Sequence, residues 1–257
     1  MLLNTIYNED CFETFKRIDD KSIDMVLTSP PYDNLRTYNG YSWDFENTAR
    51  ELFRILKDGG VVVWVVGDAT INGSETGTSF KQALYFKEIG FNLHDTMIWV
   101  KNQMAYPSKN RYYGAFEFMF ILSKSRPKTF NPIKDKRNIS EGRKWTGTQR
   151  KPNGETEQHT NKDYVCGERG IRWNYWLIYN QSRGIHSGHP ATFPLQLAID
   201  HIISWSNEGD VVLDPFIGSG TTAMACVSLN RQYIGCELSK KYHDIAIRRV
   251  DAAKHNL

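Results

Sequence analysis

Cysteine is scarce in this sequence. The four cysteines among the 257 residues are Cys11, Cys166, Cys226 and Cys236. They form no Cys-x-x-Cys pair, so we expect reduced thiols rather than a disulfide framework or a zinc site. His186 and His189 stand three residues apart, but no further acid or cysteine completes a cluster with them. We therefore predict no metal site.

Long apolar runs are also missing. No stretch of about 18 consecutive apolar residues occurs, so no transmembrane helix is expected. The first five residues are not a basic segment followed by an apolar one, so we expect no signal peptide and a cytoplasmic location. With 40% hydrophobic and 24% charged residues, the composition indicates a globular fold and excludes a disordered or collagen-like chain.

Net charge is small but unevenly distributed. The chain totals +3, yet residues 124–151 contain ten basic and two acidic residues. A basic segment on an otherwise slightly acidic protein is typical of a polyanion partner such as a nucleic acid. A solvated, flexible loop is the alternative interpretation of the same feature.

Hydrophobic patterning predicts alternating strands and helices. Short runs rich in apolar residues predict strands over residues 2–7, 23–28, 61–66, 96–100, 116–122, 211–213 and 232–236. Helical spacing predicts helices over residues 43–57, 80–88, 195–205, 221–229 and 241–253, with Gly59-Gly60 ending the first. Runs that are apolar on both faces belong inside parallel sheets, so we predict an α/β fold with a mostly parallel sheet and helices on both faces.

A polar, turn-rich stretch interrupts this pattern. Between residues 125 and 188 the sequence is basic and rich in proline and glycine, and regular periodicity fades. The stretch is too long for an ordinary loop of a compact domain. We predict an insert over 125–188 that divides the sheet domain into residues 1–124 and 189–257.

A glycine turn lies between a predicted strand and helix. Residues 218–223 read Gly-Ser-Gly-Thr-Thr-Ala, the G-x-G-x-x-A form of a nucleotide-binding turn. Glu237 ends the next strand, 19 residues after Gly218, where an acid can bond the ribose of an adenosine-containing ligand. Glycines used only for packing are the alternative. Only 20 residues follow Glu237, so the remaining strands must come from earlier in the chain, and the sheet is predicted to be circularly permuted.

A stiff loop follows the predicted strand 23–28. Ser29-Pro30-Pro31-Tyr32 combines a hydroxyl, two prolines and an aromatic ring. The prolines fix two φ angles and remove two backbone donors, so the carbonyls are left free to accept. Ligands of such sheets bind beyond the carboxyl ends of the strands, which is where this loop lies. Taken alone, Pro-Pro-Tyr is better interpreted as a turn with one packed aromatic ring.

The two motifs together resemble those of the amino-methylating DNA methyltransferases of the permuted, beta-class arrangement. Ser29-Pro30-Pro31-Tyr32 is similar to the catalytic motif of that family, and Asp214-Pro215-Phe216-Ile217-Gly218-Ser219-Gly220 to its cofactor motif, with the insert between them as the target-recognition region. The resemblance implies a Rossmann-like methyltransferase fold, S-adenosylmethionine as cofactor and double-stranded DNA as substrate. It also implies a bacterial, archaeal or phage-encoded protein.

The resemblance also implies roles for individual residues. Ser29, Pro30, Pro31 and Tyr32 would be catalytic. The expected cofactor-binding residues are Asp10, Asp214, Phe216, Gly218, Gly220, Thr221, Thr222 and Glu237, although Asp10 reads equally as a surface turn acid. The expected phosphate contacts are Lys134, Lys136, Arg137, Arg143 and Lys144. Trp145, Trp173 and Trp176 are candidates to probe bases, with core packing the better interpretation of the last two.

The substrate base is a finer question. The Thr-Ser-Pro-Pro-Tyr form is similar to that of cytosine-N4 enzymes, whereas adenine-N6 enzymes more often carry Asp in place of Ser29. We therefore predict methylation of cytosine N4 in a flipped base, with restriction–modification as the setting. An adenine-N6, RNA or protein-glutamine methyltransferase and a non-catalytic DNA-binding relative are the alternatives. The sequence leaves a homodimer and a cognate restriction endonuclease open.

Overall fold

The computed structural model describes residues 2–31, 43–102, 109–144, 147–158, 165–179 and 193–255. Tyr32, Trp145, His186 and His189 lie outside these residues. The chain forms two compact units, the first made of residues 1–131 and 174–257 and the second of residues 132–173. We describe each unit by itself.

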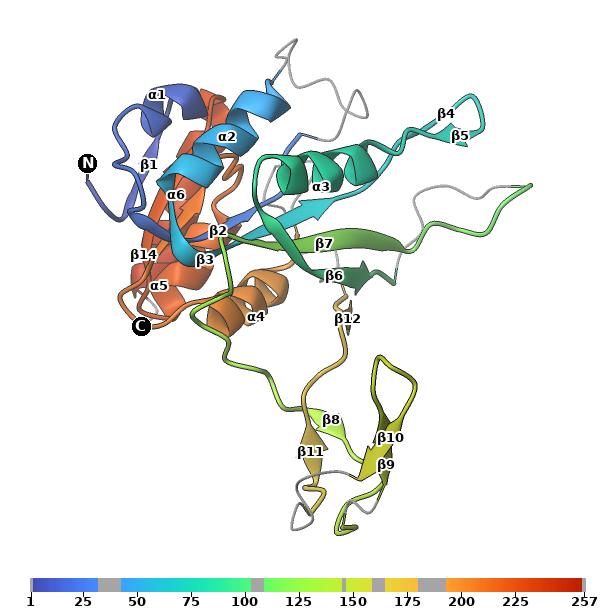
Figure 1. The fold of residues 1–257 in the computed structure, drawn as a ribbon. Helices are drawn as coiled ribbons and strands as arrows, with labels where there is room; N and C mark the ends of the chain where they lie inside the picture. Colours follow the sequence, from blue (N-terminus) through green and yellow to red (C-terminus); the bar gives the residue numbers. More distant parts are fainter. Residues whose placement is uncertain are drawn as a thin grey trace. The chain divides into compact units, whose positions relative to one another are not determined.

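The first unit is built on one eight-stranded sheet (Figure 1). Its strands, in spatial order, are β1 (Thr5–Tyr7), β14 (Gln232–Cys236), β13 (Val211–Asp214), β2 (Ile23–Thr28), β3 (Leu56–Val66), β7 (Phe116–Ser123), β6 (Asn92–Val100) and β12 (Tyr175–Leu177). Within this sheet β7 runs antiparallel to both neighbours, and every other pairing is parallel. A separate hairpin pairs β4 (Thr70–Ile71) with β5 (Ser74–Glu75). The prediction of a mostly parallel sheet is confirmed.

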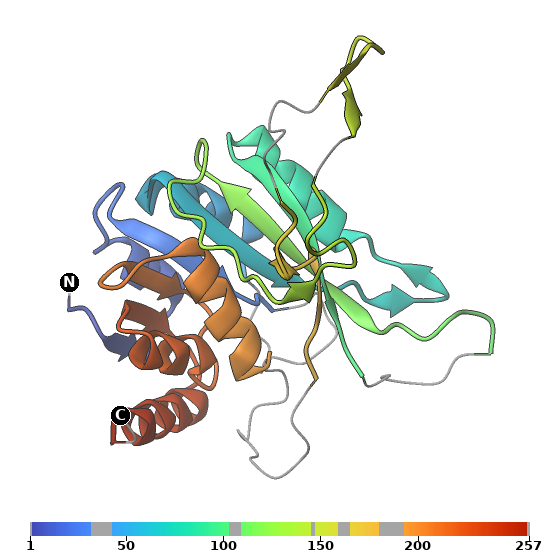
Figure 2. The same ribbon diagram turned by 90° about the horizontal axis from the view of Figure 1, so that it is seen from below.

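Helices cover both faces of this sheet. The first face carries α1 (Cys11–Phe15), α2 (Phe45–Ile55) and α3 (Thr78–Glu88), and the second carries α4 (Leu195–Trp205), α5 (Thr221–Ser228) and α6 (Lys240–His255). Figure 2 shows the last three, coloured orange to red, together on one side of the sheet. Alternate residues of β3 serve the two cores: Val63 packs with α4–α6, whereas Trp64 packs with α1–α3. This two-sided burial explains why the strand is a continuous apolar run.

The two ends of the chain meet in the sheet. Thr5 of β1 pairs with Ile234 of β14, and Met25 of β2 pairs with Val212 of β13. The glycine-turn strand β13 thus lies directly beside the strand that leads to Ser29, although the two are far apart in sequence. The predicted circular permutation is confirmed.

Gly59 and Gly60 do not end the helix as predicted. Helix α2 ends at Ile55, and β3 begins at once with Leu56, so the glycines lie inside the strand. The Lys124 ammonium caps the helix by donating to the carbonyls of Phe53 (2.7 Å) and Leu56 (3.1 Å). The pairing of β3 with β2 shifts register here, and a Cβ at Gly60 would lie 2.8 Å from the Asp24 carbonyl oxygen. The two glycines therefore allow an irregularity in the strand and a close approach of the neighbouring backbone.

The second unit is small and has little interior. Its strands are β8 (Lys136–Arg137) paired with β11 (Arg169–Gly170), and β9 (Thr148–Arg150) paired with β10 (Thr156–Gln158). None of its described residues is buried. An ion pair between Arg172 and Asp135 (2.5 Å) joins its two ends. The second unit is shorter than the insert expected at 125–188, because residues 125–131 and 174–179 belong to the first unit. Residues 174–179 include strand β12, which pairs with β6.

Across the described ranges, no helix is long and apolar enough to cross a membrane. The same residues contain no group of three or more His, Cys, Asp or Glu side chains that could hold a metal ion. All four cysteines are free thiols, and Cys11, Cys226 and Cys236 are buried.

Candidate active site

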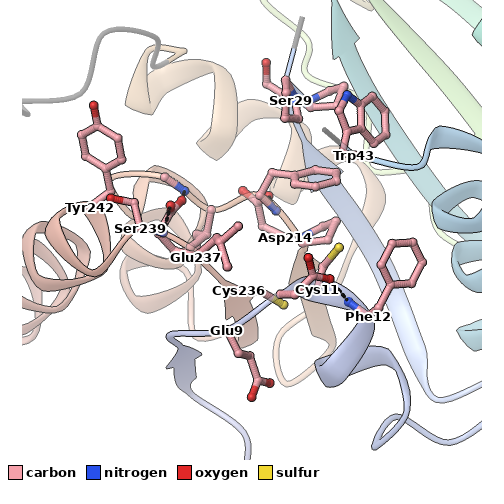
Figure 3. A pocket seen from close by; sticks show the side chains of 18 of the residues that line it. Glu9, Cys11, Phe12, Ser29, Trp43, Asp214, Cys236, Glu237, Ser239 and Tyr242 are labelled. Carbon is pink, nitrogen blue, oxygen red and sulfur yellow. Dashed lines mark hydrogen bonds between the residues drawn. The ribbon is translucent and has the colours of Figure 1, made fainter. Parts of the chain in front are cut away.

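A cavity of about 1010 Å³ lies in the first unit, where strands β1, β2, β13 and β14 end (Figure 3). This is the carboxyl edge of the sheet, where α/β folds bind their ligands. The predicted site residues that line it are Asp10, Ser29, Pro30, Pro31, Asp214, Phe216, Gly218, Thr221 and Glu237. Gly220 and Thr222 do not line it, and Tyr32 lies outside the described residues. The two motifs therefore share one cavity.

Ser29 and the prolines enter the cavity from the end of β2. The last residue of that strand, Thr28, is fully buried, and Val26 pairs with Leu213 of β13 two residues before it. In the view of Figure 3, Asp214 lies between Ser29 and Glu237. The cavity thus has a Ser29 end and a Glu237 end.

The glycine turn after β13 adopts the left-handed backbone that its sequence predicts. Gly218 has φ of +53° and Gly220 has φ of +86°, a region that side-chain-bearing residues rarely adopt. Gly220 also contacts α6, because a Cβ there would lie 3.0 Å from the Cβ of Ala246. Gly220 therefore shapes the turn and lets two helices approach closely, while Gly218 faces the cavity.

Glu237 is held by the backbone at both carboxylate oxygens. Gly218 N–H donates to Oε2 (3.0 Å), and Ser239 N–H donates to Oε1 (2.8 Å). Burial raises the pKa of Glu237, and the two backbone donors oppose that rise. The acid is therefore oriented toward the turn before any ligand binds, and each oxygen keeps a lone pair for a hydroxyl donor.

Asp214 makes three hydrogen bonds in the protein interior. Thr28 Oγ1 (2.6 Å) and the Phe216 N–H (3.1 Å) donate to Oδ1, and Thr222 Oγ1 (2.6 Å) donates to Oδ2. Burial raises the pKa of Asp214 to about 6, although the hydrogen bonds to Thr222, Thr28 and Phe216 lower it. Thr222, predicted to bind the cofactor, donates to this carboxylate and does not line the cavity.

Asp10 begins helix α1. Its side chain accepts a hydrogen bond from the Phe12 N–H at 2.8 Å, as N-cap residues do, and the residue also lines the cavity. Asp10 therefore caps a helix and lines the cavity, and its contact with the cofactor stays a prediction.

Several lining residues escaped the sequence analysis. Trp43, just before α2, packs edge-on against Phe216 with ring centroids 5.3 Å apart and forms an aromatic wall. Arg50 lines the cavity from the middle of α2. Neither residue belongs to a recognisable motif. For Trp43, the sequence offered one indication, since it is the first residue of a helix predicted beside the carboxyl edge of the sheet.

The predicted DNA-contacting residues all lie in the second unit. Lys134, Arg137, Arg143 and Lys144 are exposed, and Lys136 lies over the Trp173 ring, 4.2 Å from its centroid. Within the described part of the chain, none of the five joins an ion pair. Trp176 is buried in the core as expected, but Trp173 is 55% exposed, contrary to the core-packing interpretation. The reason is that Trp173 lies in a unit without an interior.

The cavity fits an adenosine-containing cofactor. Its volume is at the upper end of the roughly 300–1,000 Å³ of small-molecule sites. Glu237 offers acceptors for ribose hydroxyls, and Phe216 and Trp43 offer apolar aromatic faces. The glycine turn allows a ligand to approach the backbone.

Comparisons with known proteins agree with this geometry. The model of the N6/N4 DNA methylase family matches residues 23–248. The orphan methyltransferase M.BamHII of Bacillus amyloliquefaciens is 56% identical over 247 residues, which cover 91% of each chain. A putative DNA modification methylase of Thermus thermophilus, solved with S-adenosyl-L-methionine, has a TM-score of 0.65 at 25% identity, covering 98% of this chain and 96% of its own.

The PvuII cytosine-N4-specific DNA methyltransferase shares the fold, with a TM-score of 0.69, 21% identity and coverage of 98% of this chain and 91% of its own. A family match over most of the chain and a relative at 56% identity, added to the permuted sheet and the shared cavity, identify the protein's family. The chain belongs to the N6/N4 DNA methylase family and is a DNA methyltransferase that uses S-adenosylmethionine.

Proposed function

We propose that this enzyme transfers a methyl group to the N4 amine of cytosine in duplex DNA, on a base flipped out of the helix. One observation carries the proposal: Ser29, Pro30 and Pro31 line the same cavity as the glycine turn and Glu237. An acceptor base at the Ser29 end would face a methyl donor bound at the Glu237 end. Ser29 stands where adenine-N6 enzymes more often carry an acid, which favours cytosine.

The Ser29 end activates the amine in this proposal. An exocyclic amine is a poor nucleophile because its lone pair is delocalised into the ring. The Ser29 hydroxyl and the Pro30 carbonyl accept its N–H hydrogen bonds and localise that lone pair. The prolines keep these acceptors in place, since both φ angles are fixed and neither residue has a competing N–H. Tyr32 supplies a ring on which the flipped base stacks, worth about 1–3 kcal/mol.

The Glu237 end holds the cofactor. Glu237 bonds the ribose hydroxyls, the backbone around Gly218 and Thr221 meets the methionine portion, and Phe216 packs against the ligand. The bound cofactor supplies an electrophilic methyl group on a sulfonium. The amine nitrogen forms its bond to the methyl carbon as the carbon–sulfur bond breaks, the electron pair stays on sulfur, and the excess N–H proton passes to water. Alignment of donor and acceptor can supply about 7–11 kcal/mol.

The second unit recognises the DNA in this proposal. Lys134, Lys136, Arg137, Arg143 and Lys144 contact phosphates, and the exposed Trp173 is available to a base. Action on chromosomal or phage DNA implies a cytoplasmic place of work. The proposal requires neither a homodimer nor a cognate restriction endonuclease.

The test is to incubate the protein with tritiated S-adenosylmethionine and unmethylated genomic DNA, digest the DNA to nucleosides and separate them by chromatography. We expect label in N4-methylcytosine, and a reaction without DNA gives the background. Label in N6-methyladenine would overturn the assigned base and leave the family intact. Absence of label in DNA, with cofactor still bound, would redirect the search to RNA or protein substrates.

A further inference from the structure

Thr28 and Asp214 connect the two halves of the active site, although they lie 186 residues apart in sequence. Thr28 directly precedes Ser29, and Asp214 directly precedes the cofactor turn. Both are buried, with exposed fractions of 0% and 2%. Thr28 does not line the cavity, so it touches neither ligand and acts only through its neighbours.

The hydrogen bond between Thr28 and Asp214 lies just beyond the last backbone pair of strands β2 and β13. The ladder between β2 and β13 ends with the pair Val26 and Leu213. Beyond it, β2 continues to Thr28 and then Ser29, and β13 ends at Asp214 before the cofactor turn. The 2.6 Å bond from Thr28 Oγ1 to Asp214 Oδ1 joins the strands just past that last pair. The same carboxylate accepts from Phe216 N–H in the turn and from Thr222 in α5, so one side chain ties three segments together.

We propose that Thr28 and Asp214 are positioning residues that set the distance and angle between the amine bound at Ser29 and the methyl donor bound at the glycine turn. The inference deepens the proposed function and rests on its assignment of the two ends of the cavity. Methyl transfer requires nitrogen, carbon and sulfur in line, and a misplacement of about 1 Å costs roughly 100-fold in rate. A buried carboxylate shared by both loops fixes this alignment from the wall of the cavity.

The choice of an acid supports a positioning role. A neutral residue would fill the space without a buried charge, whereas the carboxylate accepts three hydrogen bonds and fixes three donors at once. The titratable groups that face it are Glu237 at the end of β14 and the thiols of Cys226 and Cys236. Burial raises the pKa of both thiols, so they stay neutral, and the Glu237 charge raises the pKa of Asp214.

The experiment compares Thr28→Val with Thr28→Ser in the full-length enzyme. Valine keeps the shape and loses the hydroxyl, and serine keeps the hydroxyl. Single-turnover methyl transfer is measured at saturating S-adenosylmethionine and DNA, with the cofactor Kd from calorimetry. We expect Thr28→Val to slow transfer about 10- to 100-fold with Kd changed less than about twofold, and Thr28→Ser to stay within about threefold of wild type. Thr28→Ala provides a second hydroxyl-free variant if Thr28→Val folds poorly.

The pH profile adds a readout that a purely structural role would not change. Protonation turns one acceptor oxygen of Asp214 into a donor, so the carboxyl group can no longer accept all three hydrogen bonds. The transfer rate of the wild type should therefore fall as pH drops through about 6. Removing the Thr28 donor raises the pKa of Asp214, so the acid limb should move to higher pH in Thr28→Val and stay in place in Thr28→Ser.

Equal rates in all variants would overturn the inference, as would an equal loss of rate and cofactor affinity in Thr28→Val or an acid limb unmoved by that substitution. The base that carries the label is read in the same assay. Label in N6-methyladenine would defeat the assignment to cytosine while leaving the comparison of rates intact, so the two claims fail separately.

Discussion

Asp214 is a carboxyl group held inside the protein among hydroxyl and backbone donors, with 2% of its surface exposed. Burial raises its pKa from 3.8 to about 6, so the folded state binds its proton more tightly than the unfolded state does. The free energy of unfolding therefore loses a contribution as pH rises from about 4 to about 6. At neutral pH the buried charge of Asp214 lowers the free energy of unfolding by about 3 kcal/mol. The protein keeps the carboxylate nevertheless, because its hydrogen bonds hold the site in shape.

Replacing Asp214 with asparagine should separate stability from activity. We expect the difference in unfolding free energy, variant minus wild type, to rise by about 1–1.5 kcal/mol between pH 5 and pH 7.5, because only the wild type must keep a buried charge. Methyl transfer should fall, since a neutral amide holds the two loops less firmly. Urea unfolding at both pH values measures the first effect. A difference that is constant with pH would show that Asp214 titrates normally.

At the residue scale, the sequence located cavity-lining residues where they belong to motifs of consecutive residues. Ser29 and Glu237 were found because each follows a strand and belongs to a compact motif, and both line the cavity. Thr28 and Trp43 were not found, because their partners lie far away in sequence, Asp214 for one and Phe216 for the other. Such contacts exist only once the sheet places the strands side by side.

At the scale of elements, the packing of α5 against α6 depends on Gly220. The residue has φ of +86°, and the space for a Cβ is taken by Ala246, 3.0 Å from its Cβ and 3.1 Å from its Cα. The nearest atoms include helix backbone, which cannot rotate away. Gly77 is a matched control: it also precedes a helix with positive φ (+65°), but nothing lies within 4 Å of its Cβ position.

We therefore expect Gly220→Ala to destabilise the protein more than Gly77→Ala. The control bears only the left-handed strain, about 1–2 kcal/mol. Gly220→Ala adds displacement of α6, about 1–3 kcal/mol more, and weakens cofactor binding because the turn moves. Denaturant unfolding and cofactor calorimetry on both variants measure this. Equal losses would mean that α6 yields freely and that the close approach is unimportant.

Element boundaries show where local sequence rules reach their limit. Helix α4 and strand β14 have the bounds that periodicity predicted, because each pattern is unambiguous. At Gly59-Gly60 the rule that glycine ends a helix failed, because α2 ends earlier, where Lys124 from just after β7 caps it, and the glycines lie inside strand β3. The role of the two glycines depends on the neighbouring strands β2 and β7. Periodicity within one segment of sequence does not show which strands will be its neighbours.

At the scale of the whole molecule, the division of labour between the two units predicts a salt effect. Five basic residues of the second unit are assigned to phosphates, and each contact releases a counterion from DNA. Replacing Arg143 with glutamine should weaken DNA binding on all sequences alike and reduce the slope of log K against log salt concentration by about 1. Lys81→Gln, an exposed position on α3 in the first unit, should change neither. Fluorescence anisotropy at several salt concentrations measures the slope for each variant. Identical slopes for the two variants would contradict the assignment of Arg143, in the second unit, to a DNA phosphate.

The central claim is that one cavity holds the methyl acceptor at the Ser29 end and the cofactor at the Glu237 end. The most direct test measures cofactor Kd and single-turnover methyl transfer in Ser29→Ala and Glu237→Gln side by side. We predict that Ser29→Ala transfers about 100-fold more slowly or worse with Kd unchanged. Glu237→Gln should raise Kd about tenfold or more and transfer near the wild-type rate once saturated. If Ser29→Ala retained the wild-type rate, or if both variants lost affinity and rate together, the account of a cavity with two distinct ends would be wrong.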